Sequence, residues 1–266
     1  MERRGQGSFE YVLMIAGVVL VLTVIVVVLQ NQATGSSQAV EQNVEHHELV
    51  ACMSTEVFER SKSLVASWHF DEESGTVAGD SSGNGNLGTI IGTVDVVKGK
   101  IGNARNFDNS ADRMSVAVID LPDDPGSQWT IEAWFKYPFP SDFVCYNTLT
   151  RGVVDHQVIV DRCGGSFLGT FSNTVLPYFF SSGFDTDTLS DGWHHLAAVG
   201  QGGQTAFYID GELVGTSAWQ STSDVVSIGN FQSGTQPFGT IDEVKIYSRA
   251  LSVDEIKADM NCEVRL

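Results

Sequence analysis

The chain has 266 residues, of which 33 are acidic and 15 are basic, so its formal net charge at pH 7 is -18. This length allows one substantial β domain with an appendage and leaves little room for two unrelated domains. The negative charge repels phosphate backbones and anionic lipid headgroups, which argues against nucleic acid as a partner. It suits a surface in salty water or one that holds divalent cations, and a plain solvated acidic face is the simpler interpretation.

The first predicted element is an apolar helix near the N-terminus. Residues 12–29 are all apolar or small except Thr23. A run of this length matches the roughly 20 residues that cross a bilayer as a helix. Arg3 and Arg4 precede the run, so the positive-inside rule keeps the N-terminus cytoplasmic and sends the C-terminal bulk of the chain outside the cell.

Glu10 interrupts the apolar character just before this run. An ionisable group at membrane depth is costly unless it is paired, so it usually has a function. Residues 6–13 read QGSFEYVL, and this stretch resembles the class III signal peptide of archaeal pilins. The resemblance implies that a prepilin peptidase cuts between Gly5 and Gln6. Residues 1–5 are then a cleaved leader and residues 6–32 a transmembrane helix that later enters a filament core.

The carboxylate of Glu10 has a physical role in such a filament. It can meet the new amino terminus of Gln6 on a neighbouring copy of the chain, which pairs two groups that are costly in an apolar setting. The alternative is a permanent membrane anchor with Glu10 near the interface. A cleaved secretory signal is disfavoured, because its apolar core is shorter and a small-residue cleavage site follows closely.

Residues 33–61 form a predicted linker or stalk. The composition becomes polar at residues 30–37 (QNQATGSS), where glycine and serine can end or hinge a helix. Apolar residues then recur at roughly helical spacing through residues 38–60. This pattern predicts an amphipathic helix.

From Leu64 onward the hydrophobic period changes to two, which is typical of β-strands. In the run 129–136 the apolar series begins at Trp129, and the intervening series, which includes Glu132 and Trp134, is expected on the opposite face. Further short strands follow between turn-forming residues, and Asp210 with Gly211 is a strong two-residue hairpin signal. The pattern predicts a mainly β chain whose residues 62–262 form a two-sheet antiparallel sandwich.

Five motifs in order along this region resemble laminin-G-like, concanavalin-A-like jelly rolls. They are LVASWHFDE with DSSGNGN (64–86), TIEAW (130–134), WHHLA (193–197), YIDG (208–211) and GTIDEVKIY (239–247). The resemblance covers about residues 62–260. The closing SVDE (252–255) is a capping box that opens a short helix.

The four cysteines show neither a CxxC pair nor zinc-finger spacing, and outside the cell two disulfides can persist. Of the three pairings, we prefer Cys52 with Cys262, which flank the β region, and Cys145 with Cys163, which bracket two apolar runs. Buried free thiols are the alternative.

The best metal candidate is the loop 80–86, which places side-chain oxygens at alternate positions. Calcium prefers six to eight oxygens from a flexible loop. The resemblance implies a structural Ca²⁺ here in many relatives, with Asp80, Asn84 and Asp242 as ligands. A Gly/Asn turn without metal is the alternative.

Catalytic motifs are absent from the sequence: it holds no GxSxG elbow, no phosphate-binding glycine loop and no HExxH. Asp242 and Glu243 are consecutive, so on a strand they face opposite sides and do not form a glycosidase pair. His194 and His195 are expected to be one core-facing and one exposed residue. Aromatic residues near turns could stack on sugars, and the candidates are Trp219, Tyr146, Tyr178 and Phe231.

Three functional hypotheses follow. The leading one is a non-enzymatic structural subunit of an archaeal type IV pilus-like surface filament, first in the cell membrane and then extracellular, which displays a lectin-like domain for adhesion. Its partners are copies of itself, prepilin peptidase, the membrane before assembly, and glycans. The second hypothesis is a monomeric membrane-anchored extracellular carbohydrate-binding protein, and the third is an anchored glycan-active enzyme.

Overall fold

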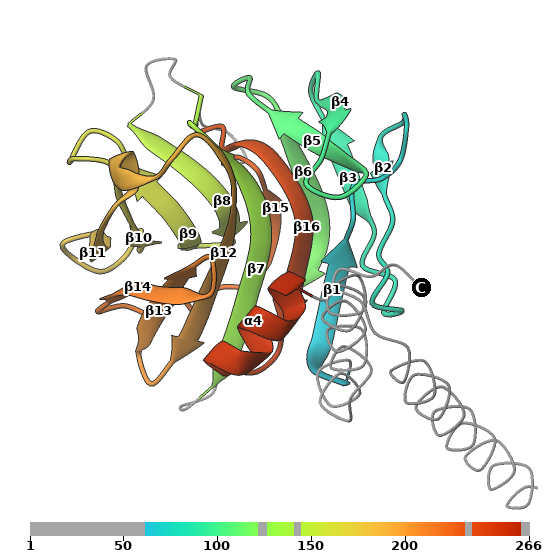
Figure 1. The fold of residues 1–266 in the computed structure, drawn as a ribbon. Helices are drawn as coiled ribbons and strands as arrows, with labels where there is room; N and C mark the ends of the chain where they lie inside the picture. The colour runs from blue at the N-terminus through green and yellow to red at the C-terminus, as the bar shows by residue number, and fades with distance from the viewer. Residues whose placement is uncertain (1–61, 122–126, 141–144, 232–235, 262–266) are drawn as a thin grey trace, which may run out of the picture. The chain divides into compact units, whose positions relative to one another are not determined.

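A computed structural model describes residues 62–121, 127–140, 145–231 and 236–261 (Figure 1). The apolar segment, the stalk, Cys52 and Cys262 lie outside the described residues, so the predictions made for them are not tested by the structure. Among the described residues, no helix is long and apolar enough to span a membrane.

Two antiparallel sheets form the described part of the chain, as the sequence predicts. The first sheet has the order β14-β13-β12-β7-β16-β5-β4, and β1 also pairs with β16. Its strands are β1 (Leu64–Trp68), β4 (Asp95–Lys98), β5 (Asn103–Phe107), β7 (Gln128–Tyr137), β12 (Gly192–Gln201), β13 (Gln204–Ile209), β14 (Glu212–Ser217) and β16 (Gly239–Tyr247).

The second sheet lies behind the first in Figure 1 and has the order β11-β10-β9-β8-β15-β6-β3-β2. Its strands are β2 (Val77–Ala78), β3 (Gly88–Ile91), β6 (Arg113–Ile119), β8 (Tyr146–Gly152), β9 (His156–Asp161), β10 (Phe167–Phe171), β11 (Phe179–Asp185) and β15 (Val225–Ile228). A 3₁₀ turn, η1 (Thr186–Thr188), and one helix, α4 (Val253–Asn261), complete the described elements.

The core lies between the sheets and uses the apolar series that the sequence predicts. Ala66, Trp68 and Phe70 are fully buried, and the rings of Phe70 and Phe107 meet edge to face with centroids 6.0 Å apart. The indole Nε1 of Trp68 donates to the carbonyl oxygen of Asn86 at 2.8 Å. The opening strand is therefore tied to the loop that follows it.

Strand β7 departs from the predicted alternation because both of its faces are buried. Glu132 and Trp134, expected on the face opposite the core, are only 1% and 6% exposed. Directly opposite Glu132 lie Ala197 on β12 and Lys245 on β16, the two strands that flank β7. A strand in the middle of a sheet can be buried on both faces, and the alternation of apolar and polar residues along the strand does not reveal this.

Two local sequence signals are confirmed. Asp210 and Gly211 have φ values of 51° and 76° and connect β13 to β14 as a tight hairpin. Ser252 N donates to Glu255 Oε2 at 2.8 Å, and Glu255 N donates to Ser252 Oγ at 3.3 Å, which is the reciprocal pattern of a capping box. The cap starts α4, whose Ile256 is fully buried.

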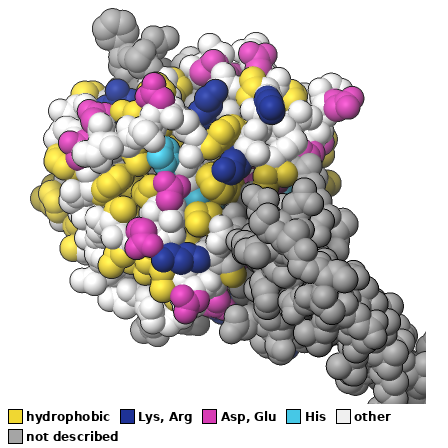
Figure 2. Space-filling view, in the orientation of Figure 1, with side chains coloured by type: hydrophobic (Ala, Val, Ile, Leu, Met, Phe, Trp, Pro, Cys, Tyr) yellow, Lys and Arg dark blue, Asp and Glu magenta, His cyan; other side chains and the backbone are white. Residues whose placement is uncertain are grey.

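Helix α4 packs on the outer face of the first sheet. Ile256 and Leu251 contact a small second cluster made with Ala197, Val199 and Tyr247. On the face that carries α4, Figure 2 shows apolar side chains interrupted by acidic and basic ones. The negative charge of the chain is thus not gathered into one acidic surface on this face.

The predicted bond between Cys145 and Cys163 is present, with Cα atoms 4.7 Å apart. The two cysteines flank the paired strands β8 and β9, and Arg162 N donates to the carbonyl oxygen of Cys145 at 2.6 Å. The disulfide therefore closes the open end of this hairpin.

Candidate functional site

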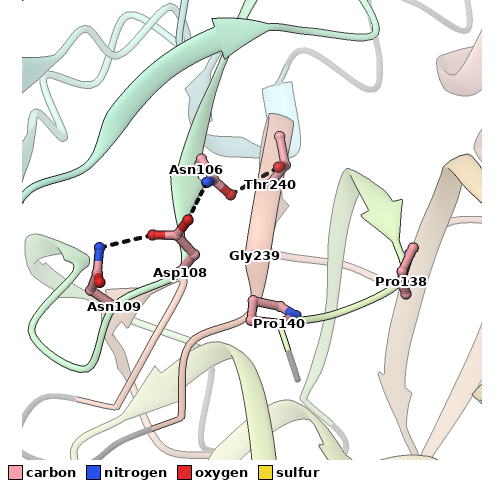
Figure 3. Close-up of a pocket in the computed structure, with 7 residues that line it drawn as sticks. All are labelled: Asn106, Asp108, Asn109, Pro138, Pro140, Gly239 and Thr240. Atoms are coloured by element: carbon pink, nitrogen blue, oxygen red, sulfur yellow. Dashed lines mark hydrogen bonds between the residues drawn. The ribbon is translucent and has the colours of Figure 1, made fainter. Parts of the chain in front are cut away.

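A polar pocket lies at one end of the first sheet, where β5 and β7 end and β16 begins. The antiparallel register pairs Gly239 with Phe107 and Thr240 with Asn106, which brings these strand ends together. The pocket has a volume of about 380 Å³. Its lining, shown in Figure 3, consists of Asn106, Asp108, Asn109, Pro138, Pro140, Gly239 and Thr240.

The polar wall of the pocket is one chain of hydrogen bonds. Thr240 Oγ1 donates to Asn106 Oδ1 at 2.9 Å, and Asn106 Nδ2 donates to Asp108 Oδ2 at 2.7 Å. Asn109 Nδ2 donates to Asp108 Oδ1 at 2.8 Å. The carboxylate of Asp108 is therefore held between two neutral amides while the side chain stays exposed.

A second layer of contacts fixes the loop that carries this wall. The fully buried Asp112 accepts from Asn109 N at 3.1 Å and from Thr93 N at 2.7 Å. Asn230, also fully buried, donates to the carbonyl oxygens of Asn109 and Ser110 at 3.2 and 3.1 Å. The bonds to Thr93 and Asn230 tie the loop to two other segments of the chain.

Pro138 and Pro140 form the opposite, apolar wall (Figure 3). Gly239 lies between this wall and the polar one with φ +100°, a conformation that L side chains rarely adopt. A Cβ atom built on Gly239 comes within 2.8 Å of Pro140 Cδ. Glycine is thus required here both by the backbone and by the space next to Pro140.

None of the sequence motifs described above predicts this pocket. Asn106, Asp108 and Asn109 form a short polar cluster at the end of a strand, which is a signal that sequence reasoning could have noticed. Their contact with Thr240 spans 134 positions of sequence, and no local period places it.

The loop 80–86, which the sequence predicts as a calcium site, is a turn held by hydrogen bonds to Asp80. The carboxylate of Asp80 accepts from the backbone N–H groups of Ser67, Ser82 and Asn86 at 3.0, 2.9 and 2.8 Å, and from Ser82 Oγ at 2.8 Å. Burial alone raises the pKa of Asp80, but these hydrogen bonds outweigh it and hold the pKa below its ordinary value. Asn84 Nδ2 donates to the carbonyl oxygens of Leu64 and Val65 at 2.9 and 3.0 Å.

Asp242 has different neighbours from Asp80. Its Oδ2 accepts from Ile101 N at 3.0 Å, and its Oδ1 accepts from Glu243 N at 2.9 Å. Within the described ranges, no three side chains of His, Cys, Asp or Glu come together as a metal-binding group. The donors around Asp80 fit a turn better than a cation, and calcium at Asp80, Asn84 and Asp242 stays a prediction.

Asp242 and Glu243, the consecutive carboxylates considered above as a glycosidase pair, both make contacts inside the protein. Asp242 is fully buried, and Glu243 is 4% exposed and pairs with Nδ1 of His69. Neither residue lines the pocket described above.

The expectation that one histidine of the pair is exposed is wrong, because both are buried. The ring of His194 lies against Phe135, and its Nδ1 is hydrogen-bonded to Asp210 Oδ2 at 2.8 Å. His195 lies against Trp134, edge to face at 5.3 Å, and burial with the nearby charge of Lys245 lowers its pKa to about 3. It is a neutral side chain on a covered sheet face.

The four aromatic candidates also pack on neighbours. Trp219 stacks on Phe180 at 5.4 Å, Tyr146 meets Phe171 edge to face at 5.6 Å, and Phe231 lies under the guanidinium of Arg151 at 4.9 Å. Tyr178 is 44% exposed and stacks one face on Phe171. None of the four lines the pocket.

Comparison with known families gives the decisive match for the sandwich. Residues 108–257 match the model of the concanavalin A-like lectin/glucanases superfamily. The chain belongs to this superfamily. Residues 3–29 match the class III signal peptide, so the two resemblances found in the sequence are both confirmed. No curated protein sequence matches the chain.

Solved structures support the superfamily fold at low identity. The receptor-binding domain of botulinum neurotoxin C/D mosaic serotype is 15% identical, with a TM-score of 0.57 over 76% of this chain and 52% of the neurotoxin chain. The binding domain of botulinum neurotoxin serotype D, solved with N-acetylneuraminic acid, is 15% identical, with a TM-score of 0.55 over 79% and 53%. The present chain thus spans about half of these neighbours.

A third neighbour is matched over nearly its whole length. Domain 4 of an extracellular arabinanase from Geobacillus stearothermophilus, solved with arabinotriose, is 21% identical, with a TM-score of 0.53. The match covers 73% of the present chain and 97% of that domain. At these identities the likeness shows a shared fold and nothing further.

Proposed function

We propose that this protein is a structural subunit of a type IV pilus-like surface filament, as in archaea, and that its jelly roll binds carbohydrate outside the cell. The observation that carries the proposal is the presence of a class III signal peptide and a lectin-like domain on one chain. The signal peptide implies processing by a prepilin peptidase. The apolar helix then leaves the membrane for a filament core made of copies of the chain.

The carboxylate of Glu10 is the expected assembly determinant. In an apolar filament core it needs a partner, and the new amino terminus of Gln6 on a neighbouring copy supplies one. The filament would place many jelly rolls side by side, which raises their effective concentration at a glycan-coated surface. A role in adhesion follows from this arrangement.

The proposal assigns the jelly roll a binding role and no catalytic one. It is supported by the contacts of Asp242 and Glu243, whose carboxylates are engaged with the backbone of Ile101 and Glu243 and with the ring of His69. A glycosidase needs two carboxyl groups on either side of a scissile bond, at separations of about 5 to 10 Å. Among the described residues that line the pocket, one carries a carboxyl group, Asp108.

The test uses the mature N-terminus and one matched pair of variants. Mass spectrometry should find a chain that begins at Gln6, whereas a permanent anchor begins at Met1. Glu10→Gln should abolish filaments seen by electron microscopy, because the buried pair is lost. Glu2→Gln makes the same chemical change in the leader, which processing removes, so this variant should assemble normally.

Two results would overturn the proposal. One is a surface protein that retains Met1 and remains monomeric, which would show the anchored carbohydrate-binding protein instead. The other is an undiminished filament yield from the Glu10→Gln variant with correct processing.

A further inference from the structure

The pocket at the ends of β5, β7 and β16 has the chemistry of a sugar-binding site. Its polar wall offers an amide, a carboxylate and a hydroxyl from Asn106, Asp108 and Thr240, and these groups both donate and accept hydrogen bonds. Sugar hydroxyls are likewise donors and acceptors. A small number of convergent polar groups beside apolar walls is typical of small-molecule sites.

The negative charge of Asp108 favours neutral sugars over acidic ones in this pocket. Asp108 is the one charged side chain among the described residues that line the pocket, and its partners in Figure 3 are the neutral Asn106 and Asn109. No lysine or arginine is part of the described lining. An anionic ligand therefore meets a carboxylate without compensation, in a chain whose net charge is -18.

The size and walls limit the ligand to a short stretch of saccharide. The volume of about 380 Å³ lies near the lower end of the roughly 300 to 1,000 Å³ range of ligand pockets. The rings of Pro138 and Pro140 offer an apolar surface for the C–H face of a sugar ring. One or two sugar units fit these dimensions better than an extended chain.

Hydrogen bonds within the protein hold the loop that carries the polar wall. The buried carboxylate of Asp112, in the same loop as Asn109, ties this loop to Thr93, and the buried amide of Asn230 ties it to a segment 121 positions away. Ligand binding then requires little ordering of the protein, which favours affinity.

We propose that this pocket binds a neutral saccharide, with Asp108 and Asn106 bonding to neighbouring hydroxyls and Pro138 and Pro140 covering one face of the ring. The inference rests on the proposed function, since it names the ligand class of the displayed domain. It separates this chain from the neurotoxin neighbour that was solved with N-acetylneuraminic acid, an acidic sugar.

The experiment measures sugar binding by the full-length chain in detergent, using calorimetry or ligand-observed NMR. The probes are a panel of neutral oligosaccharides that includes arabinotriose, and N-acetylneuraminic acid as the acidic sugar. At least one neutral probe should bind, and Asp108→Ala and Asn106→Ala should each weaken it at least tenfold. Asp120→Ala is the matched control, because Asp120 is exposed and follows the far end of β6 from the pocket.

Asp108→Asn adds a test of the charge. It removes the negative charge and keeps one acceptor oxygen. The ratio of the affinity for a neutral sugar to that for N-acetylneuraminic acid should therefore fall, while the protein stays folded. Thermal melts of every variant should match the unaltered chain within a few degrees.

The outcomes are distinguishable. If a neutral sugar binds equally well to the Asp108 and Asn106 variants, the pocket assignment is overturned and carbohydrate binding by the domain stands. If N-acetylneuraminic acid binds better than every neutral probe, the inferred ligand class is wrong. If no saccharide binds the unaltered chain, the carbohydrate-binding part of the proposed function fails as well.

Discussion

Gly239 is the residue at which backbone conformation and pocket shape depend on each other. Its φ of +100° and the 2.8 Å approach of a built Cβ to Pro140 are two separate reasons for glycine. Gly239→Ala should therefore lower the free energy of unfolding by about 1 to 2 kcal/mol for the backbone, with about 1 to 3 kcal/mol more for the clash. Denaturant unfolding followed by tryptophan fluorescence measures the sum.

Gly203 provides the control for this prediction. It has φ +82°, but a built Cβ there has no neighbour within 4 Å. Gly203→Ala should show the backbone cost alone, and the difference between the two variants isolates the contact with Pro140. Equal losses for both variants would mean that Pro140 moves aside freely and that the pocket wall is not rigid.

The loop that follows β1 depends on one carboxylate. Asp80 accepts four hydrogen bonds that join residues 67, 82 and 86. Asp80→Asn replaces one of the two acceptor oxygens by an NH₂ group, which faces N–H or O–H donors and cannot accept from them. The free energy of unfolding should therefore fall by about 1 to 3 kcal/mol. Because the donors already fill the carboxylate, we expect the same loss in EDTA and in calcium, measured as the shift in Tm.

The same experiment decides the calcium prediction. A rise in Tm of the unaltered chain with calcium, absent from the Asp80→Asn variant, would show that calcium replaces some of these hydrogen bonds. Asp120→Asn, an equal change of charge at an exposed site, should respond to calcium as the unaltered chain does.

Elements defined by local rules were predictable from the sequence. The hairpin at Asp210 needs only two residues that tolerate positive φ, and the cap of α4 needs only Ser252 and Glu255 at the right spacing. Four cysteines allow three pairings, and spacing alone does not choose among them. The hairpin of β8 and β9 brings Cys145 and Cys163 together, which the sequence does not show.

Features that depend on how strands and helices pack together in space could not be predicted from local sequence rules. The period of two places Glu132 opposite the core, but it does not tell whether that opposite face meets water. Likewise, the pocket joins Asn106 to Thr240 through the register of β5 with β16, which a single sequence does not contain.

Two buried histidines couple the stability of the whole sandwich to pH. Burial and the charge of Arg151 lower the pKa of His156 to about 3, and burial and the charge of Lys245 do the same for His195. In the unfolded chain both groups bind a proton near pH 6.5. As the pH falls from 6.5 towards 3, the unfolded state binds more protons than the folded state, so stability is lost across this window.

The window from pH 6.5 to 5.5 isolates this effect, because carboxyl groups with lowered pKa, such as Glu255 at about 2, begin to contribute only as the unfolded chain takes up protons near pH 4.5. Each histidine should contribute a slope that approaches about 1.4 kcal/mol per pH unit at its acidic end. His195→Phe removes one titrating group and keeps a ring against Trp134, so the slope should fall by one histidine's share. Above pH 7 the curves for variant and unaltered chain should run parallel. An unchanged slope between pH 6.5 and 5.5 would mean that His195 takes up its proton in the folded state and that the covered face of the first sheet admits water.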